Sequence, residues 1–304
     1  MRCKLERNST YSAMNVIETV ALTKSYGQQR GIDKVSIAVK KGEVFGFIGP
    51  NGAGKSTTIR TLLGLLHPTS GSALLFGEDA VKQGHLLRQR IGYLPSEVDY
   101  YAEMTSRELL HYHADLFGIM GATKKIEDLA QYFELDLDRP IADLSFGNKK
   151  KCAIIQAVVH EPELLILDEP TSGLDPLMQN RFFELLEQRN ADGTTIFFSS
   201  HILSEIQRMC DRAAIIRDGE ITAVEDITTL LSKQMKKVRL VLQNGDRPEL
   251  PEGAKHAEWI GNKVHFDYVG PTQELLGWLN QQLVLDLTLS EPDLESIFMN
   301  YYRR

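Results

Sequence analysis

The sequence has few cysteines, no long apolar segment and no excess of positive charge. Its three cysteines, Cys3, Cys152 and Cys210, lie far apart, so they match neither a disulfide framework nor the spacing of a metal site. It contains no run of about 18 apolar residues, the length that a helix needs to cross a bilayer. The net charge of -7 argues against a broad basic surface. We therefore expect a chain in a reducing compartment, without a membrane span, whose partners do not include nucleic acid.

The length and composition are those of an ordinary globular protein. The chain has 304 residues, of which 42% are apolar and 25% charged, enough for one large domain and a smaller one. Residues 1–14 carry charge but no apolar segment typical of a signal peptide. We expect residues 1–14 to form a tail, with Met14 as an alternative start.

Residues 15–224 show the pattern of an α/β fold. Short β-rich runs end in Gly, Asp or Ser and lead into helical stretches, which is typical of a sheet covered on both faces. Helical patterns dominate between about 97 and 160, as in SRELLHYHADLFGI and KKIEDLAQYFEL. We expect an α/β core with a helical subdomain. The predicted core strands are Val44–Ile48, Leu164–Leu167, Thr195–Ser199 and Ala213–Ile216.

Residues 225–304 have a different character, and we expect a small α+β accessory domain there. A short helix is predicted at Asp226–Ser232 and a turn at Asn244-Gly245. The strand-like runs VRLVL, HAEWI, KVHFDYV and LVLDLTL follow, with a hairpin predicted at Gly261-Asn262 and a helix after Pro271. A last helix is predicted to carry one apolar stripe, made of Leu294, Ile297, Phe298 and Tyr301.

The segment Gly49–Ser56 reads GPNGAGKS and satisfies the phosphate-binding pattern GxxxxGK[ST]. The apolar run VFGFI precedes it and the helical pattern TTIRTLLGLL follows, which is the strand–loop–helix context that the pattern requires. Glycines let backbone N–H groups surround phosphates, and the helix N-terminus adds positive potential. Lys55 is predicted to reach the β- and γ-phosphates and Ser56 to bind Mg²⁺. The nucleotide-binding residues predicted here are Gly49, Pro50, Asn51, Gly52, Ala53, Gly54, Lys55, Ser56 and Thr57.

Two acids follow the apolar run Leu164–Leu167. Such a strand is buried, so it delivers Asp168 and Glu169 to the carboxyl edge of the sheet, where ligands of these folds bind. Asp168 is predicted to hold Mg²⁺ through water, and Glu169 to act as the general base that polarises the attacking water.

With these segments in place, the chain resembles an ABC ATPase over residues from about 15 to 224. The segment Pro170–Asp175 resembles the D-loop of that family, and His201 after TTIFFSS resembles its switch histidine. Leu144–Asn148, which reads LSFGN, resembles the LSGGQ signature. Tyr26 stands where the family has an aromatic that stacks on adenine. The resemblance implies roles for Asp175 in nucleotide binding and for His201 as a contact of the γ-phosphate.

The resemblance also implies a head-to-tail dimer in which each ATP lies between one subunit's phosphate-binding loop and the other's signature segment. Ser145 and the N–H of Gly147 begin the helical run KKKCAIIQAVV, so they would offer donors and a helix dipole to the γ-phosphate. ATP and Mg²⁺ are the implied ligands. Whether the second ATPase subunit is an identical chain stays open, with a homodimer expected.

The chain departs from the family pattern in two places. Ser96 stands where the family has Gln at the end of a strand. Either Glu97 supplies the oxygen that faces Mg²⁺ and water, or the loop acts only mechanically. The signature has Phe146 for Gly and Asn148 for Gln, while it keeps Ser145 and Gly147.

The LPSE loop, the SFGNKKK signature and the ending EPDLESIFMNYY together resemble ATPases of ABC-2-type exporters. This resemblance implies a separate transmembrane permease as partner and a place on the cytoplasmic face of the membrane. An importer ATPase is one alternative, although importer C-terminal domains are usually longer. A non-transport ABC protein that acts on ribosomes or DNA is another; the single phosphate-binding loop, the absence of sustained heptads and the acidic balance argue against it.

Overall fold

The computed structural model describes residues 15–290, apart from 28, 101–102, 228, 230–235 and 244–246. The tail predicted for residues 1–14, the turn at Asn244-Gly245 and the last helix lie outside the described residues, as does most of the predicted helix Asp226–Ser232. The chain divides into two units, Met1–Val224 and Glu225–Arg304.

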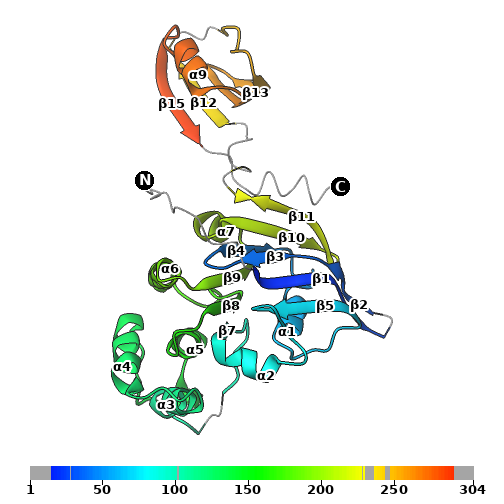
Figure 1. The fold of residues 1–304 in the computed structure, drawn as a ribbon. Helices are drawn as coiled ribbons and strands as arrows, with labels where there is room; N and C mark the ends of the chain where they lie inside the picture. Colours follow the sequence, from blue (N-terminus) through cyan, green and yellow to red (C-terminus); the bar gives the residue numbers. More distant parts are fainter. Residues whose placement is uncertain are drawn as a thin grey trace. The chain divides into compact units, whose positions relative to one another are not determined.

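The first unit is built on a six-stranded sheet in the order β11-β10-β4-β9-β8-β7 (Figure 1). The four pairings from β10 to β7 are parallel. Its apolar strands β4, β8 and β9 are buried throughout, because helix α1 covers one face and α6 (Pro176–Ala191) and α7 (Leu203–Met209) cover the other. The four predicted core strands are confirmed. The strand bounds are β4 Val44–Ile48, β7 Ile91–Leu94, β8 Leu164–Asp168, β9 Thr195–Ser200, β10 Arg212–Arg217 and β11 Glu220–Asp226.

A second, antiparallel sheet lies on the other side of helix α1 (Lys55–Leu62), which packs on strands of both sheets (Figure 1). Its order is β2-β1-β5-β6, with β3 pairing to β1. Ile17, Ile59, Leu62 and Phe197 belong to the core cluster that joins the two sheets. The strand bounds are β1 Asn15–Tyr26, β2 Gln29–Val35, β3 Ala38–Lys40, β5 Ser70–Leu75 and β6 Glu78–Asp79.

A layer of helices connects β7 to β8 and packs on β7 through α5 (Phe146–Val158). Helix α3 (Ser106–Leu116) begins with a capping box in which Thr105 and Glu108 bond each other's backbone N–H groups. It ends before the predicted 119 because Gly118 takes a positive φ of 65°. Helix α4 (Ala122–Phe133) packs on α3 and α5. The shorter elements are α2 Gly84–Leu87, η1 Arg88–Arg90 and η2 Ile141–Asp143.

The second unit is a four-stranded antiparallel sheet in the order β13-β14-β12-β15, with helix α9 (Thr272–Leu279) on its apolar face. The hairpin predicted at Gly261-Asn262 is confirmed, and Gly261 takes the positive φ of 64° that the turn needs. The core of this unit contains Val238, Leu240, Val264, Phe266, Tyr268 and Leu275. The strand bounds are β12 Lys236–Leu242, β13 Ala254–Ile260, β14 Lys263–Tyr268 and β15 Val284–Ser290.

Candidate active site

A pocket of about 380 Å³ lies in the first unit, where helix α1 begins. It brings the phosphate-binding loop and the start of α1 together with one residue each of β1, β2, the loop after β7 and the turn after β8. These segments are far apart in the sequence, so the pocket exists only through the fold. The lining residues are Tyr26, Gly31, Asn51, Gly52, Gly54, Lys55, Ser56, Thr57, Ser96 and Glu169.

Glycine conformation shapes the phosphate-binding loop. Gly54 has φ 107° and directly precedes α1, and a Cβ there would lie 2.7 Å from the Cγ2 atom of Ile32 and 2.9 Å from the carbonyl oxygen of Gly31. Any other residue would therefore be both strained and obstructed. Because the first N–H groups of a helix have no partner within it, α1 turns donors and positive potential towards the pocket. Of the predicted loop residues, Gly49, Pro50 and Ala53 do not line the pocket.

Lys55, Glu169 and His201 form a chain of charged and polar groups. The Lys55 ammonium, which is buried, donates to the carbonyl oxygens of Gly49 (2.7 Å) and Pro50 (3.2 Å). It also pairs with Glu169, 3.1 Å from Nζ to Oε1. The other Glu169 oxygen lies 2.8 Å from Nδ1 of His201. Two basic side chains therefore hold the Glu169 carboxylate at the edge of the pocket.

The adjacent acids Asp168 and Glu169 have different environments. Asp168 is buried at the end of β8, and its Oδ1 accepts a hydrogen bond of 2.7 Å from the Ser199 hydroxyl. The chain turns at Glu169, where φ is 47°, a left-handed conformation that residues other than glycine adopt rarely. Such conformations concentrate at functional sites. The turn separates a fixed, buried carboxylate from one that reaches the pocket.

Ser56 and Asp168 offer the kinds of oxygen that Mg²⁺ binds, although only Ser56 lines the pocket and Asp168 is buried, directly before Glu169 in the sequence. Mg²⁺ takes hard oxygen ligands and is usually held by one or two protein groups together with waters and substrate phosphates. The described residues contain no group of three or more His, Cys, Asp or Glu that could hold a metal by themselves. A site completed by phosphate and water is therefore the kind that these side chains can form.

The loop after β7 presents Ser96, and not Glu97, to the pocket. Ser96 is among the lining residues, whereas Glu97 is exposed and is not. The assignment of Glu97 as a Mg²⁺ ligand therefore disagrees with this geometry. An exposed carboxylate keeps its hydration, and placing its full charge against phosphate oxygens would cost free energy unless Mg²⁺ lay between them.

The signature residues do not line the pocket of their own chain. Ser145 is the exposed N-cap of α5 and accepts a hydrogen bond from the N–H of Asn148, and Gly147 lies in the first turn. The departure Phe146 is accommodated by Gly173, where a Cβ would lie 2.2 Å from the Phe146 ring. A glycine is required there for the ring to lie against the chain.

Asp175 acts as the N-cap of α6 and does not line the pocket. Its Oδ1 accepts hydrogen bonds of 3.0 Å from the N–H groups of Leu177 and Met178. The predicted contact with nucleotide therefore has no counterpart within one chain. Tyr26, in contrast, ends β1 beside the pocket with its ring 46% exposed, a position from which it can stack on a base.

Three groups around the site are not among the residues predicted from the sequence. Gly31 lines the pocket, where a Cβ would lie 2.9 Å from the Tyr26 ring. Lys150 is fully buried under the Ser96 loop. Its position on the same helix face as Ala153, Ile154 and Ala157 was the signal that could have found it, because a lysine in an apolar stripe needs a partner.

Glu205 is the third of these groups. Its buried carboxylate accepts hydrogen bonds of 2.6 Å from the hydroxyls of Thr171 and Ser200. Thr171 lies two residues after Glu169, and Ser200 precedes His201. Glu205 therefore joins the segments that carry the two side chains of the Glu169–His201 pair.

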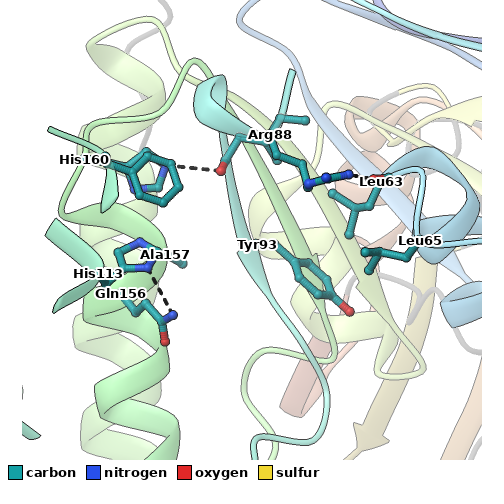
Figure 2. Close-up of a pocket in the computed structure, with 10 residues that line it drawn as sticks. Leu63, Leu65, Arg88, Tyr93, His113, Gln156, Ala157 and His160 are labelled. Atoms are coloured by element: carbon teal, nitrogen blue, oxygen red, sulfur yellow. Dashed lines mark hydrogen bonds between the residues drawn. The ribbon is translucent and has the colours of Figure 1, made fainter. Parts of the chain in front are cut away.

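A second cavity of about 230 Å³ lies between the sheet core and the helical layer. Figure 2 shows His113 of α3 and His160 at the end of α5 on one wall, with Tyr93 and Leu63 facing them. The Gln156 amide lies 3.2 Å from Nδ1 of His113, and Nε2 of His160 lies 3.1 Å from the carbonyl oxygen of Ile91. The remaining ring nitrogens, Nε2 of His113 and Nδ1 of His160, have no hydrogen-bond partner within the described part of the chain.

Comparisons with known proteins agree with the phosphate-binding loop and the α/β fold described above. The family described as ABC transporter matches residues 32–172. A bacitracin transport ATP-binding protein of Bacillus licheniformis is 38% identical, and the alignment covers 93% of this chain and 96% of the relative. The chain belongs to the ABC transporter ATP-binding proteins. This family consists of ATPases. A Nod factor export ATP-binding protein of Burkholderia orbicola is 33% identical over 91% of this chain and 93% of its own length.

Solved structures agree with the assignment to the ABC ATP-binding proteins. A structure of the ATP-binding subunit of an ABC transporter matches with a TM-score of 0.67 and 32% identity, covering 71% of this chain and 91% of that chain. A dimeric ABC transporter cassette matches in fold, with a TM-score of 0.64 over 69% of this chain. No helix within the described residues is long and apolar enough to span a membrane.

Proposed function

We propose that this ABC ATP-binding protein is the motor subunit of an ABC-2-type exporter and drives a separate transmembrane permease from the cytoplasmic face of the membrane. The observation that carries the proposal is the length of the similarity. It includes the C-terminal unit and extends over 93% and 91% of the chain for relatives named for bacitracin transport and Nod factor export.

We assign the hydrolysis to the residues around the pocket. The backbone N–H groups of the phosphate-binding loop and Lys55 bind the β- and γ-phosphates, while Tyr26 supports the base. Glu169 orients the attacking water and accepts its proton, and His201 contacts the γ-phosphate. Ser56 and Asp168 are the residues that would hold Mg²⁺, which neutralises the charge that develops on the phosphates.

We also propose that two ATPase subunits, most simply two copies of this chain, enclose ATP between them. The position of the exposed Ser145 and the half-buried Gly147 at the start of α5, outside the pocket of their own chain, supports this proposal. A partner's Ser145 hydroxyl and helix N-terminus would then supply donors to the γ-phosphate.

The substitution Glu169→Gln tests the hydrolytic assignment. It should leave ATP binding intact and lower kcat by roughly 10²–10⁴-fold, the usual contribution of a general base. With hydrolysis blocked, the variant should accumulate as an ATP-bound dimer, measurable by light scattering during gel filtration. Near-normal turnover would remove Glu169 from its role, and a variant that stays monomeric with ATP would contradict the enclosed-ATP dimer.

Capture of partner proteins from membranes tests the transport assignment. The tagged Glu169→Gln chain, expressed in cells and supplied with ATP, should retain a polytopic membrane protein after detergent extraction. Recovery of ribosomal or DNA-bound partners, with no membrane protein, would overturn it.

A further inference from the structure

Helix α5 carries a run of three lysines, of which the middle one is buried. Lys150 has no exposed surface, whereas Lys149 and Lys151 are half-buried. Lys150 shares the inner face of the helix with Ala153 and Ala157, at a spacing of i, i+3 and i+7. Lysine is almost never fully buried unless its ammonium is paired, so the partners of this group explain its position.

The partners are two consecutive backbone carbonyls of the loop that faces ATP. The Lys150 ammonium donates to the oxygen of Pro95 at 2.8 Å and to that of Ser96 at 3.2 Å. This loop directly follows β7, and Ser96 lines the ATP pocket. Burial lowers the pKa of Lys150 to about 8, while the negative charges of Asp168 and Glu169 oppose that change. The group is therefore protonated at neutral pH.

An apolar side chain would fill this space at a lower desolvation cost. It would also remove the donor from two half-buried carbonyls, and the chain between β7 and α3 would keep only the hydrogen bond of 2.8 Å from the Tyr100 hydroxyl to Gln156 as a side-chain attachment to α5 among the described contacts. The buried ammonium of Lys150 is therefore placed where it can fix the loop after β7. The helix that it belongs to begins with Ser145 and Gly147, the residues assigned to the second ATP of a dimer.

We propose that Lys150 is a positioning residue for ATP hydrolysis, which holds Ser96 at the pocket by fixing the Pro95–Ser96 carbonyls to the signature helix α5. The inference rests on the proposed function, since it concerns how the hydrolytic pocket is kept in its active geometry. Lys150 itself does not touch the substrate; it acts through Ser96.

The test compares Lys150→Met, which keeps an unbranched chain and removes the donors, with Lys150→Gln, which keeps a neutral donor. Lys150→Met should lower kcat by about fivefold, the loss expected when the Ser96 hydroxyl leaves the pocket, while KM for Mg-ATP changes by less than about twofold. Lys150→Gln should recover part of the loss. Hydrogen–deuterium exchange of the segment 93–100 should accelerate in Lys150→Met without a general rise elsewhere.

Lys149→Met and Lys151→Met are matched controls, since they make the same change one position away on the same helix. They should keep the wild-type kcat and the wild-type exchange of segment 93–100. If folded Lys150→Met keeps both its kcat and its loop exchange, the inference is wrong. If all three variants lose activity to the same extent, the loss reflects a disturbed helix α5 and not the Lys150 contact. The inference is wrong in that case too. An inactive wild type would instead contradict the proposed function, and the exchange measurement would still decide whether Lys150 fixes the loop.

Discussion

The Glu169 carboxylate lies between Lys55 and His201, and this arrangement determines what each side chain can do. The Lys55 ammonium is within 3.1 Å of one carboxylate oxygen and the His201 ring within 2.8 Å of the other. A base held by two partners has a defined orientation towards water, which is the condition for efficient proton transfer. The neighbouring Asp168 is fixed separately by Ser199, so the two acids do not compete for one role.

At the same residue scale, Ser96 and Glu97 can be distinguished by mutation. Ser96→Ala should lower kcat about fivefold, because it removes a hydroxyl that can bond water or phosphate in the pocket, and such a bond has a net contribution of about 1 kcal/mol. Glu97→Ala should leave the rate unchanged, because that side chain is exposed and outside the lining. Steady-state ATPase assays at saturating Mg-ATP measure both. A larger loss in Glu97→Ala would restore Glu97 as the Mg²⁺-facing group, and no effect in either would favour a purely mechanical loop.

At the scale of elements, the contact between the helical layer and β7 depends on two neutral histidines. The ring of Phe117 packs against both imidazoles, with centroid distances of 4.6 Å to His113 and 4.2 Å to His160. Burial, with a smaller contribution from His160, lowers the pKa of His113 to about 4. Burial also lowers the pKa of His160. The cavity between these elements therefore excludes protonated imidazole.

This environment predicts acid sensitivity of the fold. The unfolded chain binds a proton at His113 below about pH 6.5, while the folded chain does so only near 4. The free energy of unfolding should therefore fall as the pH drops from 6.5 to 4, by up to roughly 3 kcal/mol from this residue. Urea unfolding at a series of pH values measures it. His113→Phe should flatten this slope, whereas His85→Phe, at an exposed position, should keep it. An unchanged slope in His113→Phe would show that the loss arises elsewhere.

At the scale of the whole molecule, the groups assigned to hydrolysis all lie in the first unit. The second unit has its own sheet and its own core, built around Leu240, Phe266 and Tyr268. Strand β11 extends to Asp226, and Ile227 is buried. A truncation that removes the C-terminal unit must therefore keep the chain through Ile227. The C-terminal unit is therefore expected to be dispensable for the chemical step.

A chain that ends after Ile227 tests this expectation. It should fold and keep a kcat close to that of the full-length protein, because every proposed phosphate contact lies before residue 202. ATPase rate, thermal melting and ATP-dependent dimerisation of the Glu169→Gln form should be compared with the full-length chain. A retained rate with altered dimerisation would assign a regulatory role to residues 228–304. Loss of activity in a folded truncation would make the C-terminal unit part of the catalytic unit.

The sequence by itself determined the phosphate-binding loop, the acids after β8 and the order of strands and helices. These features are local: Gly49–Ser56 and Leu164–Glu169 are continuous segments whose spacing carries their chemistry. The β-rich runs and the hairpin at Gly261-Asn262 follow from side-chain periodicity and turn preference in the same way.

Only the tertiary structure decided that Ser96 and not Glu97 faces the pocket, that Asp175 caps a helix, and that Lys150 and Glu205 fix the surrounding loops. Lys150 and the carbonyl of Pro95 are 55 residues apart, and Glu205 and Thr171 are 34 apart. The partner of a buried polar group depends on which distant backbone or side chain the fold places beside it, and no local pattern encodes that. The residues assigned to the chemistry were therefore named from the chain, whereas the contacts that hold them in position became visible only when the elements had packed.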